Sequence, residues 1–167
     1  MSRLHILRYP DARLHRIAAP VEEINQGIRT LVADMAETMY AAPGVGLAAT
    51  QVNVHQQIIV IDASDTRDKL LTLINPEILV AVGVADCEEG CLSVPGIYEK
   101  IERAGQVVVR ARGLDGASFD IEADGLLAVC IQHEMDHLKG RVFVEYLSRL
   151  KQTRIRAKMQ KQQRQSA

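Results

Sequence analysis

Apolar residues recur at steps of three and four residues in the first quarter of the chain, which is the spacing of one helix face. They are Ile28, Leu31, Val32, Met35 and Met39. Asn25 precedes this run in the position of a helix cap, so we expect a helix from there to about Ala41 with one side buried. A short helical turn is expected upstream, near Ala12–Ile17, because Pro10-Asp11 favours a turn start.

Short apolar runs rich in β-branched residues predict strands in the middle of the chain. QIIVIDA (57–63) is apolar almost throughout and predicts a buried strand. LLTLINPEIL (70–79) predicts a second strand, interrupted at its Asn-Pro pair. Gln106–Arg112 and Ser118–Glu122 flank Asp115-Gly116, which is typical of a hairpin.

Residues Leu126–Leu138 predict a second long helix, with Gly140 just past its end as a C-terminal stop. This helix is apolar on almost all sides before His133, so we expect it to be central and buried. Because strands cluster and helices stand apart, the pattern favours an α+β fold rather than alternating α/β. The segment AAPGVGLAATQ (41–51), rich in glycine and small residues, is expected to be a loop.

Composition is that of one globular domain. The chain has 167 residues, of which 47% are hydrophobic and 25% charged. No run approaches the roughly 20 apolar residues of a membrane span, and MSRLHILRYP lacks an apolar signal core. We therefore expect a cytoplasmic protein without a membrane partner. Three cysteines without an export signal argue against a disulfide framework.

Candidate chemistry lies in QHEMDH (132–137), which contains the pattern H-E-x-x-H. His133 and His137 are one turn apart on one helix face, so two imidazoles can share a metal ion. Glu134 would lie beside the metal, where it can accept a proton from metal-bound water. Two surface histidines are the alternative, and the apolar surroundings of this helix argue against it.

The third ligand decides the class of enzyme. Peptidases with this motif usually take it from downstream. No histidine follows His137, and the one downstream acid is Glu145, which VFVEYL predicts to lie in a strand. The remaining histidines fit surface or hydrogen-bonded core positions; they are His5, His15 and His55.

Cys91, in EEGCLSVPG, is the upstream candidate, since a thiolate binds Zn(II) or Fe(II) well. Gly90 beside it permits close backbone approach, and Pro95-Gly96 is expected to close a turn. A site of two histidines and one cysteine leaves a position open for water, as catalytic sites do. From these residues alone, an inert buried Cys91 and Cys87 as the rival thiol both stay open, and Cys130 fits a core or pocket wall.

Three segments together, GVGLAATQ (44–51), EGCLS (89–93) and QHEMDH (132–137), resemble in order and spacing the motifs of the peptide deformylase family, and the resemblance covers nearly the whole chain. Members remove the formyl group from the formyl-methionine of nascent polypeptides. The resemblance implies antiparallel sheets around a central helix that bears H-E-x-x-H, with a long N-terminal helix and a C-terminal helix. It implies one divalent metal, Fe(II) in the cell and Zn, Ni or Co in some purified forms, bound by Cys91, His133 and His137.

The resemblance also implies roles around the metal. Glu134 would be general base and then general acid, while Gln51 and the backbone N–H of Leu92 would bind the developing oxyanion. Gly46 and Gly90 would face the substrate backbone. The glycines of the first motif would then pair with an extended peptide, since the motif lacks the third glycine and the lysine of phosphate loops.

The methionine side chain needs an apolar pocket. Helical spacing places Leu126, Val129 and Cys130 on the side of His133, and Val45 joins them from the first motif; plain helix core is the alternative. Tyr98 stands where some family members carry arginine, which puts the binding of the next substrate residues in doubt. A small H-E-x-x-H metallopeptidase is the second enzyme hypothesis. An RNA-binding module with a structural metal would need a fourth protein ligand.

The C-terminal segment differs in charge from the rest of the chain. Residues 149–167 carry seven basic and no acidic residues, which leaves 13 basic and 21 acidic residues, a formal charge of −8, on residues 1–148. We therefore predict a single catalytic domain over 1–148 and a basic helix or tail over 149–167. Either this helix is simply solvated, or it contacts ribosomal RNA near emerging formyl-methionyl peptides.

Overall fold

The computed structural model describes residues 2–166 and combines two antiparallel sheets with three α-helices in that part of the chain. The larger sheet has the strand order β1-β2-β3-β6-β7, and β4 pairs with β5 alone. Its strands are β1 (Gly46–Ala48), β2 (Ile58–Ile61), β3 (Leu71–Val82), β6 (Gln106–Arg112) and β7 (Ser118–Asp124). The others are β4 (Ala85–Cys91) and β5 (Val94–Arg103), with helices α1 (Gln26–Ala41), α2 (Gly125–Leu138) and α3 (Arg149–Ser166).

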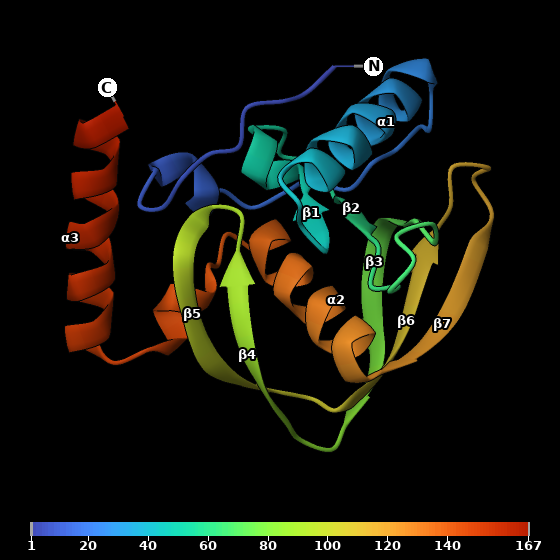
Figure 1. The fold of residues 1–167 in the computed structure, drawn as a ribbon. Helices are drawn as coiled ribbons and strands as arrows, with labels where there is room; N and C mark the ends of the chain where they lie inside the picture. The colour runs from blue at the N-terminus through green and yellow to red at the C-terminus, as the bar shows by residue number, and fades with distance from the viewer. Residues whose placement is uncertain (1, 167) are drawn as a thin grey trace.

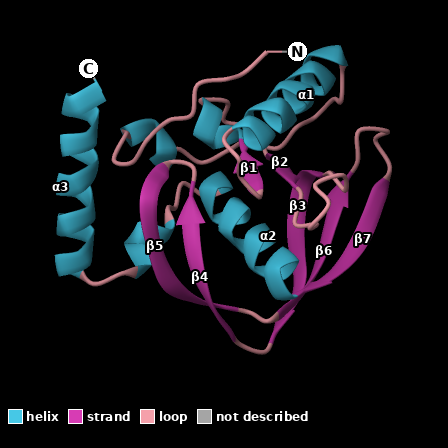
Figure 2. Cartoon of the chain, in the orientation of Figure 1, coloured by secondary structure: helices cyan, strands magenta, loops and turns pink. Residues whose placement is uncertain are grey.

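Helix α2 lies between the two sheets, with β4 and β5 on one side of it and the larger sheet on the other (Figure 1). Nine of its residues are buried, from Ala128 to Leu138. Figure 2 shows that strands flank this helix on both sides, while α1 and α3 lie outside. The expected mixture of helices with antiparallel sheets is therefore confirmed.

Strand β2 explains why its sequence is apolar at every position. Ile58 and Val60 pack with α1, while Ile59 and Ile61 pack with α2 on the opposite face, and all four side chains are 0% exposed. A strand whose two faces are both covered has no polar side, so alternation disappears. The predicted buried strand within 57–63 is confirmed.

Other predicted elements are also confirmed. Asn25 caps α1 by accepting a hydrogen bond from the Ile28 N–H at 3.0 Å. Strands β6 and β7 form the predicted antiparallel hairpin. The interruption in β3 is real, because Asn75 has φ +52° and the register with β6 shifts beside it. Gly140 follows α2 with φ +77°, as a C-terminal stop should.

Three expectations about the loops are wrong. The loop 41–51 contains β1 and a 3-10 helix, because Gly46–Ala48 pairs with β2 despite its small residues. The turn of the β4–β5 hairpin lies at Leu92-Ser93 rather than at Pro95-Gly96, since Cys91 already pairs with Val94.

The third wrong expectation concerns Glu145, which lies in a 3-10 helix, Phe143–Tyr146, and not in a strand. Its carboxylate accepts a hydrogen bond from the Val142 N–H at 3.2 Å, and its N–H donates to the Val142 carbonyl at 2.9 Å. These two local bonds close a helical turn that the aromatic and β-branched composition did not indicate.

Helix α3 packs on the N-terminal segment and on β5 through one narrow apolar strip. Ile155 and Met159 are buried there, 6% and 0% exposed, against Tyr9 and Phe143 among others. Its basic side chains are all exposed. Within residues 2–166, no helix is both long and apolar enough to cross a membrane.

Candidate active site

A cavity of about 1200 Å³ opens between α2, the β4–β5 turn, the start of β1 and the N-terminal segment. Eleven of the residues expected to form a site line it: Val45, Gly46, Gly90, Cys91, Leu92, Tyr98, Leu126, Val129, Cys130, His133 and Glu134. Gln51 and His137 are buried directly beside this lining, 1% and 0% exposed. Segments far apart in the sequence therefore meet at one hollow.

Cys91, His133 and His137 form a group in which one potential ligand atom from each lies within 4.8 Å of the others. The two histidines meet there because α2 places them one turn apart, and Cys91 arrives as the last residue of β4. The Cys91 Sγ is 3.3 Å from the His137 Nε2. Of the two thiols left open by the sequence, the structure places Cys91, and not Cys87, in this group.

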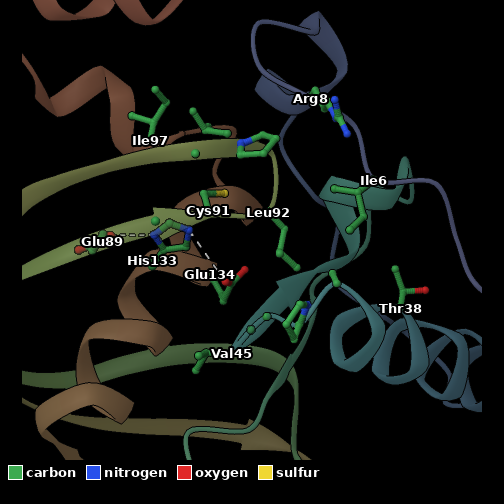
Figure 3. A pocket seen from close by; sticks show the side chains of 18 of the residues that line it. Ile6, Arg8, Thr38, Val45, Glu89, Cys91, Leu92, Ile97, His133 and Glu134 are labelled. Carbon is green, nitrogen blue, oxygen red and sulfur yellow. Dashed lines mark hydrogen bonds and ion pairs between the residues drawn. The ribbon is translucent and has the colours of Figure 1, made fainter. Parts of the chain in front are cut away.

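Glu89 holds the His133 ring from behind. Its Oε1 lies 2.7 Å from the His133 Nδ1, so the ring N–H donates to the carboxylate (Figure 3). The other ring nitrogen, Nε2, is left for the group that contains the Cys91 thiol. Burial alone would raise the pKa of Glu89, but hydrogen bonds from His133 and Arg103 outweigh it and lower that pKa. A carboxylate behind a histidine ligand is the usual arrangement in metal sites.

A buried ionic network extends from Glu89 along α2. Arg103 donates to Glu89 from Nε and Nη2 (2.8 and 3.0 Å) and to the Asp136 carboxylate from Nη1 (2.6 Å). The Tyr146 hydroxyl donates to the same Asp136 oxygen at 2.8 Å. None of these four residues was among the site residues predicted from the sequence. The sequence held two indications of them. Glu89 directly precedes Gly90-Cys91, and Asp136 is one of the two variable positions within H-E-x-x-H.

Glu134 points into the cavity from α2 beside the metal-ligand candidates (Figure 3). Its Oε1 lies 4.0 Å from the His133 Nε2, and its buried Oε2 has no hydrogen-bond partner among the described residues. Burial raises the pKa of Glu134 to about 7. A carboxyl group that titrates near neutral pH is suited to accept and return a proton.

These observations fit a divalent metal ion. Thiolate and imidazole donors suit Zn(II) and Fe(II), the His133 ring is oriented by a carboxylate, and Glu134 holds an unpaired buried oxygen nearby. Three protein donors leave room for a further ligand, as catalytic sites require. Cys130 lies outside this group of potential ligand atoms, and burial raises the pKa of its thiol to about 12.

Gln51 is fixed in one orientation beside this group. Its Oε1 accepts from the Ala48 N–H at 2.9 Å, so its amide NH₂ faces the other way. That NH₂ donates to the Ser93 Oγ at 3.1 Å and lies 3.5 Å from the Cys91 Sγ. An oriented amide donor at the edge of the cavity can stabilise negative charge that develops on a bound carbonyl.

Two glycines leave space for neighbouring side chains. A Cβ at Gly46 would lie 2.8 Å from the Glu134 Oε1, and one at Gly90 would lie 2.6 Å from the Tyr98 ring. Both glycines line the cavity, as expected, and each also permits a close side-chain approach. Leu126 is 49% exposed and lines the cavity, so plain helix core does not describe it.

The other histidines lie outside the metal-ligand group. His15 Nε2 is 2.8 Å from the Oε1 of Glu145, the one acidic residue downstream of His137. Glu145 is therefore paired with His15 and lies outside the metal-ligand group. His55 Nε2 is 3.0 Å from the Arg13 carbonyl. His5 is exposed at the far rim of the cavity.

Comparison with known proteins agrees with this geometry. Residues 3–153 match the family model described as polypeptide deformylase. The chain is 68% identical over 164 residues to peptide deformylase 2 of Nitrosomonas europaea, covering 98% of this chain and 89% of that protein. It is 61% identical over 165 residues to peptide deformylase 1 of Burkholderia multivorans, covering 98% and 91%.

Solved structures give the same result. A peptide deformylase from Legionella pneumophila superposes with a TM-score of 0.94 at 45% identity, over 98% of this chain and 97% of that one. The peptide deformylase of Ehrlichia chaffeensis in complex with actinonin gives 0.95 at 41% identity, over 98% and 99%. These likenesses favour a deformylase over the small metallopeptidase that H-E-x-x-H alone allowed.

Proposed function

Because this chain belongs to the peptide deformylase family of metalloenzymes, we propose that it hydrolyses the formyl amide of N-formyl-methionyl polypeptides and releases formate. The observation that carries the proposal is the convergence of Cys91, His133 and His137 beside Glu134 in one large cavity. A peptide terminus can reach this cavity, because it opens to solvent along the N-terminal segment and the rim at Tyr98.

Cys91, His133 and His137 would hold one divalent metal ion. When bound, such an ion polarises a carbonyl and makes water nucleophilic near neutral pH. Glu89 keeps His133 in the tautomer that leaves its Nε2 free for the ion. Fe(II) is the metal we propose for the cell, with Zn, Ni or Co in purified protein.

Glu134 moves the proton in this proposal. A carboxylate with a pKa of about 7 can take a proton from the attacking water and give it to the departing amine. The amide of Gln51 and the backbone N–H of Leu92 would donate to the formyl oxygen as it gains charge. Gln51 is suited to this because hydrogen bonds within the fold already orient both the oxygen and the NH₂ of its side-chain amide.

Substrate binding would use the walls on either side of Glu134. The apolar wall made by Leu126, Val129 and Cys130, with Val45 across from it, would accept the methionine side chain. The peptide that follows would pair with β1, which is an edge strand of its sheet within the described residues. Tyr98, 64% exposed beside Gly90, would contact the residues after methionine.

A direct test compares two reactions of the same preparation. Protein purified without oxygen, with its metal content measured, is given formyl-Met-Ala-Ser and an unformylated peptide of ten residues. We expect formate from the first and no internal cleavage of the second. Internal cleavage without formate release would instead support the small metallopeptidase.

We also propose that residues 1–148 form the catalytic domain and that the basic residues of 149–167 contact ribosomal RNA. All seven basic side chains of α3 are exposed, while Ile155 and Met159 attach the helix to the domain. Replacing Lys158, Lys161 and Arg164 with glutamine keeps that attachment. Cosedimentation of the variant with ribosomes at low salt should fall. Unchanged cosedimentation would show that these basic residues do not contact ribosomal RNA.

A further inference from the structure

The segment that leads into β1 is fixed from two directions by hydrogen bonds to its backbone groups. The Gly44 N–H donates to the Met39 carbonyl in the last turn of α1 at 2.7 Å. The Gly44 carbonyl accepts from the Arg67 Nη2, and the Val45 carbonyl accepts from the Asp62 N–H at 2.8 Å. The loop after β2 therefore holds two successive carbonyls that stand at the cavity wall.

That loop is itself tied to α1 through Asp62, whose side chain is completely buried. The carboxylate accepts from the Tyr40 hydroxyl at 2.6 Å, the Ser64 N–H at 3.0 Å and the Lys69 N–H at 3.1 Å. Hydrogen bonds to a carboxylate are among the stronger ones in proteins. The loop 62–70, the Asp62 loop, therefore forms one rigid unit with the end of α1.

Arg67 joins this unit to the wall of the cavity. Its Nη1 donates to the Asp62 carbonyl at 2.6 Å, its Nη2 to the Gly44 carbonyl, and its guanidinium lies 5.1 Å from the centre of the Tyr40 ring. Arg67 also has φ +58°, a left-handed backbone conformation that is unfavourable for a residue with a side chain. Such strain persists only where the surrounding contacts impose it.

The other side of the same segment touches the proposed reaction centre. A Cβ at Gly44 would lie 2.6 Å from the Leu92 Cδ1, and one at Gly46 would lie 2.8 Å from the Glu134 Oε1. The segment is therefore tightly packed between Arg67 on one side and the residues proposed for catalysis on the other. Its position sets the width of the cleft on the side of β1.

We propose that Arg67 is a positioning residue, which holds the Gly44 carbonyl so that β1 presents its edge at the right distance for the substrate backbone. This inference rests on the proposed function. Arg67 does not line the cavity, so it acts on the substrate only through the 44–46 segment. Its loss should therefore weaken binding of the peptide after the methionine more than it slows the chemical step.

The kinetic test compares Arg67→Met with Arg67→Lys and with Arg110→Met, a matched control whose arginine pairs with Asp120 on the surface. The substrates are formyl-Met-Ala-Ser and formyl-methionine, which lacks the downstream peptide. For Arg67→Met we expect KM for the tripeptide to rise about tenfold, kcat to change less than about twofold, and formyl-methionine to be little affected. Arg67→Lys, which keeps one charged donor, should recover part of the loss, and Arg110→Met should behave as the unmodified chain.

A second measurement does not depend on turnover. Amide hydrogen exchange of residues 44–48 in the metal-loaded protein should be faster in Arg67→Met than in Arg110→Met, while α2 exchanges equally in both. Unchanged exchange in 44–48 would overturn the proposal, as would an equal kinetic loss on both substrates. If the unmodified chain releases no formate, the proposed function fails, and the exchange measurement still decides whether Arg67 fixes this segment.

Discussion

The two walls of the cavity are built in different ways. The wall of α2 and β4 presents side chains, and buried ion pairs hold them, as in Glu89 with Arg103. The wall at the start of β1 presents mainly backbone and glycine, and is held by the Asp62 loop from outside the cavity. In the proposed function the first wall does the chemistry and accepts the methionine side chain, and the second wall binds the peptide backbone.

This difference determines how each wall can fail. A catalytic side chain can be removed with little effect on the shape of the cavity. A backbone wall has no side chain to remove, and it changes only when an added Cβ or a lost outer contact shifts it. Substitutions of the catalytic or metal-binding side chains should therefore act on kcat or on the metal, and substitutions at the second wall should act on its geometry.

The largest effect should come from Glu134→Gln. The amide is nearly the same size but cannot accept the proton, so we expect kcat to fall by about 10²–10⁴-fold. The metal content should stay close to one ion per chain, because the three candidate ligands are unchanged. A variant that keeps most of its turnover would remove Glu134 from its proposed role. Formate release and elemental analysis give both quantities.

Glu89→Ala should affect the metal rather than the proton transfer. Without its carboxylate the His133 ring loses its orientation, and metal affinity should fall about 10–100-fold. Arg103 also loses one of its two buried partners, which should cost the metal-free protein about 3–5 kcal/mol of stability. Competition with a chelator and chemical denaturation measure these two losses. Glu88→Ala, its exposed neighbour, should keep the metal, and equal losses in both variants would contradict this role.

Gly46→Ala tests the backbone wall directly. The new Cβ would lie 2.8 Å from the Glu134 Oε1, so the carboxylate or the strand must move. We expect kcat/KM to fall about tenfold or more with a stability change below about 1 kcal/mol. The control is Gly105→Ala, where the nearest atom would be 3.4 Å from the Cβ. Equal activity of the two variants would show that the wall can accommodate an added methyl group without loss of function.

Asp62→Asn tests the outer support of the backbone wall through stability rather than through activity. Burial alone would raise the pKa of Asp62, but hydrogen bonds from Ser64 and Tyr40 outweigh it and lower that pKa. The charge of Asp62 thus stabilises the fold above the ordinary aspartate pKa of about 3.9, and this contribution is lost as pH falls towards the lowered value. Near pH 7 the variant should be less stable by about 1–3 kcal/mol, and the difference should shrink below about pH 4.

Denaturation at several pH values checks this result. Asp120→Asn is the control, because Asp120 pairs with Arg110 on the surface and should show almost no difference at any pH. A constant deficit of Asp62→Asn at all pH values would mean that its charge contributes nothing to the Asp62 loop.

Much of the first wall was predictable from the sequence, because its chemistry is carried by residue types at fixed helical spacing. The H-E-x-x-H pattern placed His133, Glu134 and His137 correctly on one helix. Spacing alone could not choose between Cys91 and Cys87. The resemblance to a family pointed to Cys91, and the structure places it with the two histidines.

Most of the second wall was not predictable. Strand β1 has three small or apolar residues and no alternation, so pairing with β2 creates it rather than intrinsic preference. Arg67 lies in a polar loop 23 residues after Gly44, and nothing in the sequence indicates that it reaches back to that carbonyl. Hydrogen bonds to backbone carbonyls that are distant in sequence leave no pattern in local composition.

In the proposed function, Cys91 completes a metal site at which a formyl amide is cleaved. Cys91→Ser and Cys87→Ser, purified without oxygen, test it by metal content and formate release from formyl-Met-Ala-Ser. We expect Cys91→Ser to lose most of its metal and its formate release, whereas Cys87→Ser should retain the metal. A Cys91→Ser protein that keeps both the metal and full formate release would contradict this expectation.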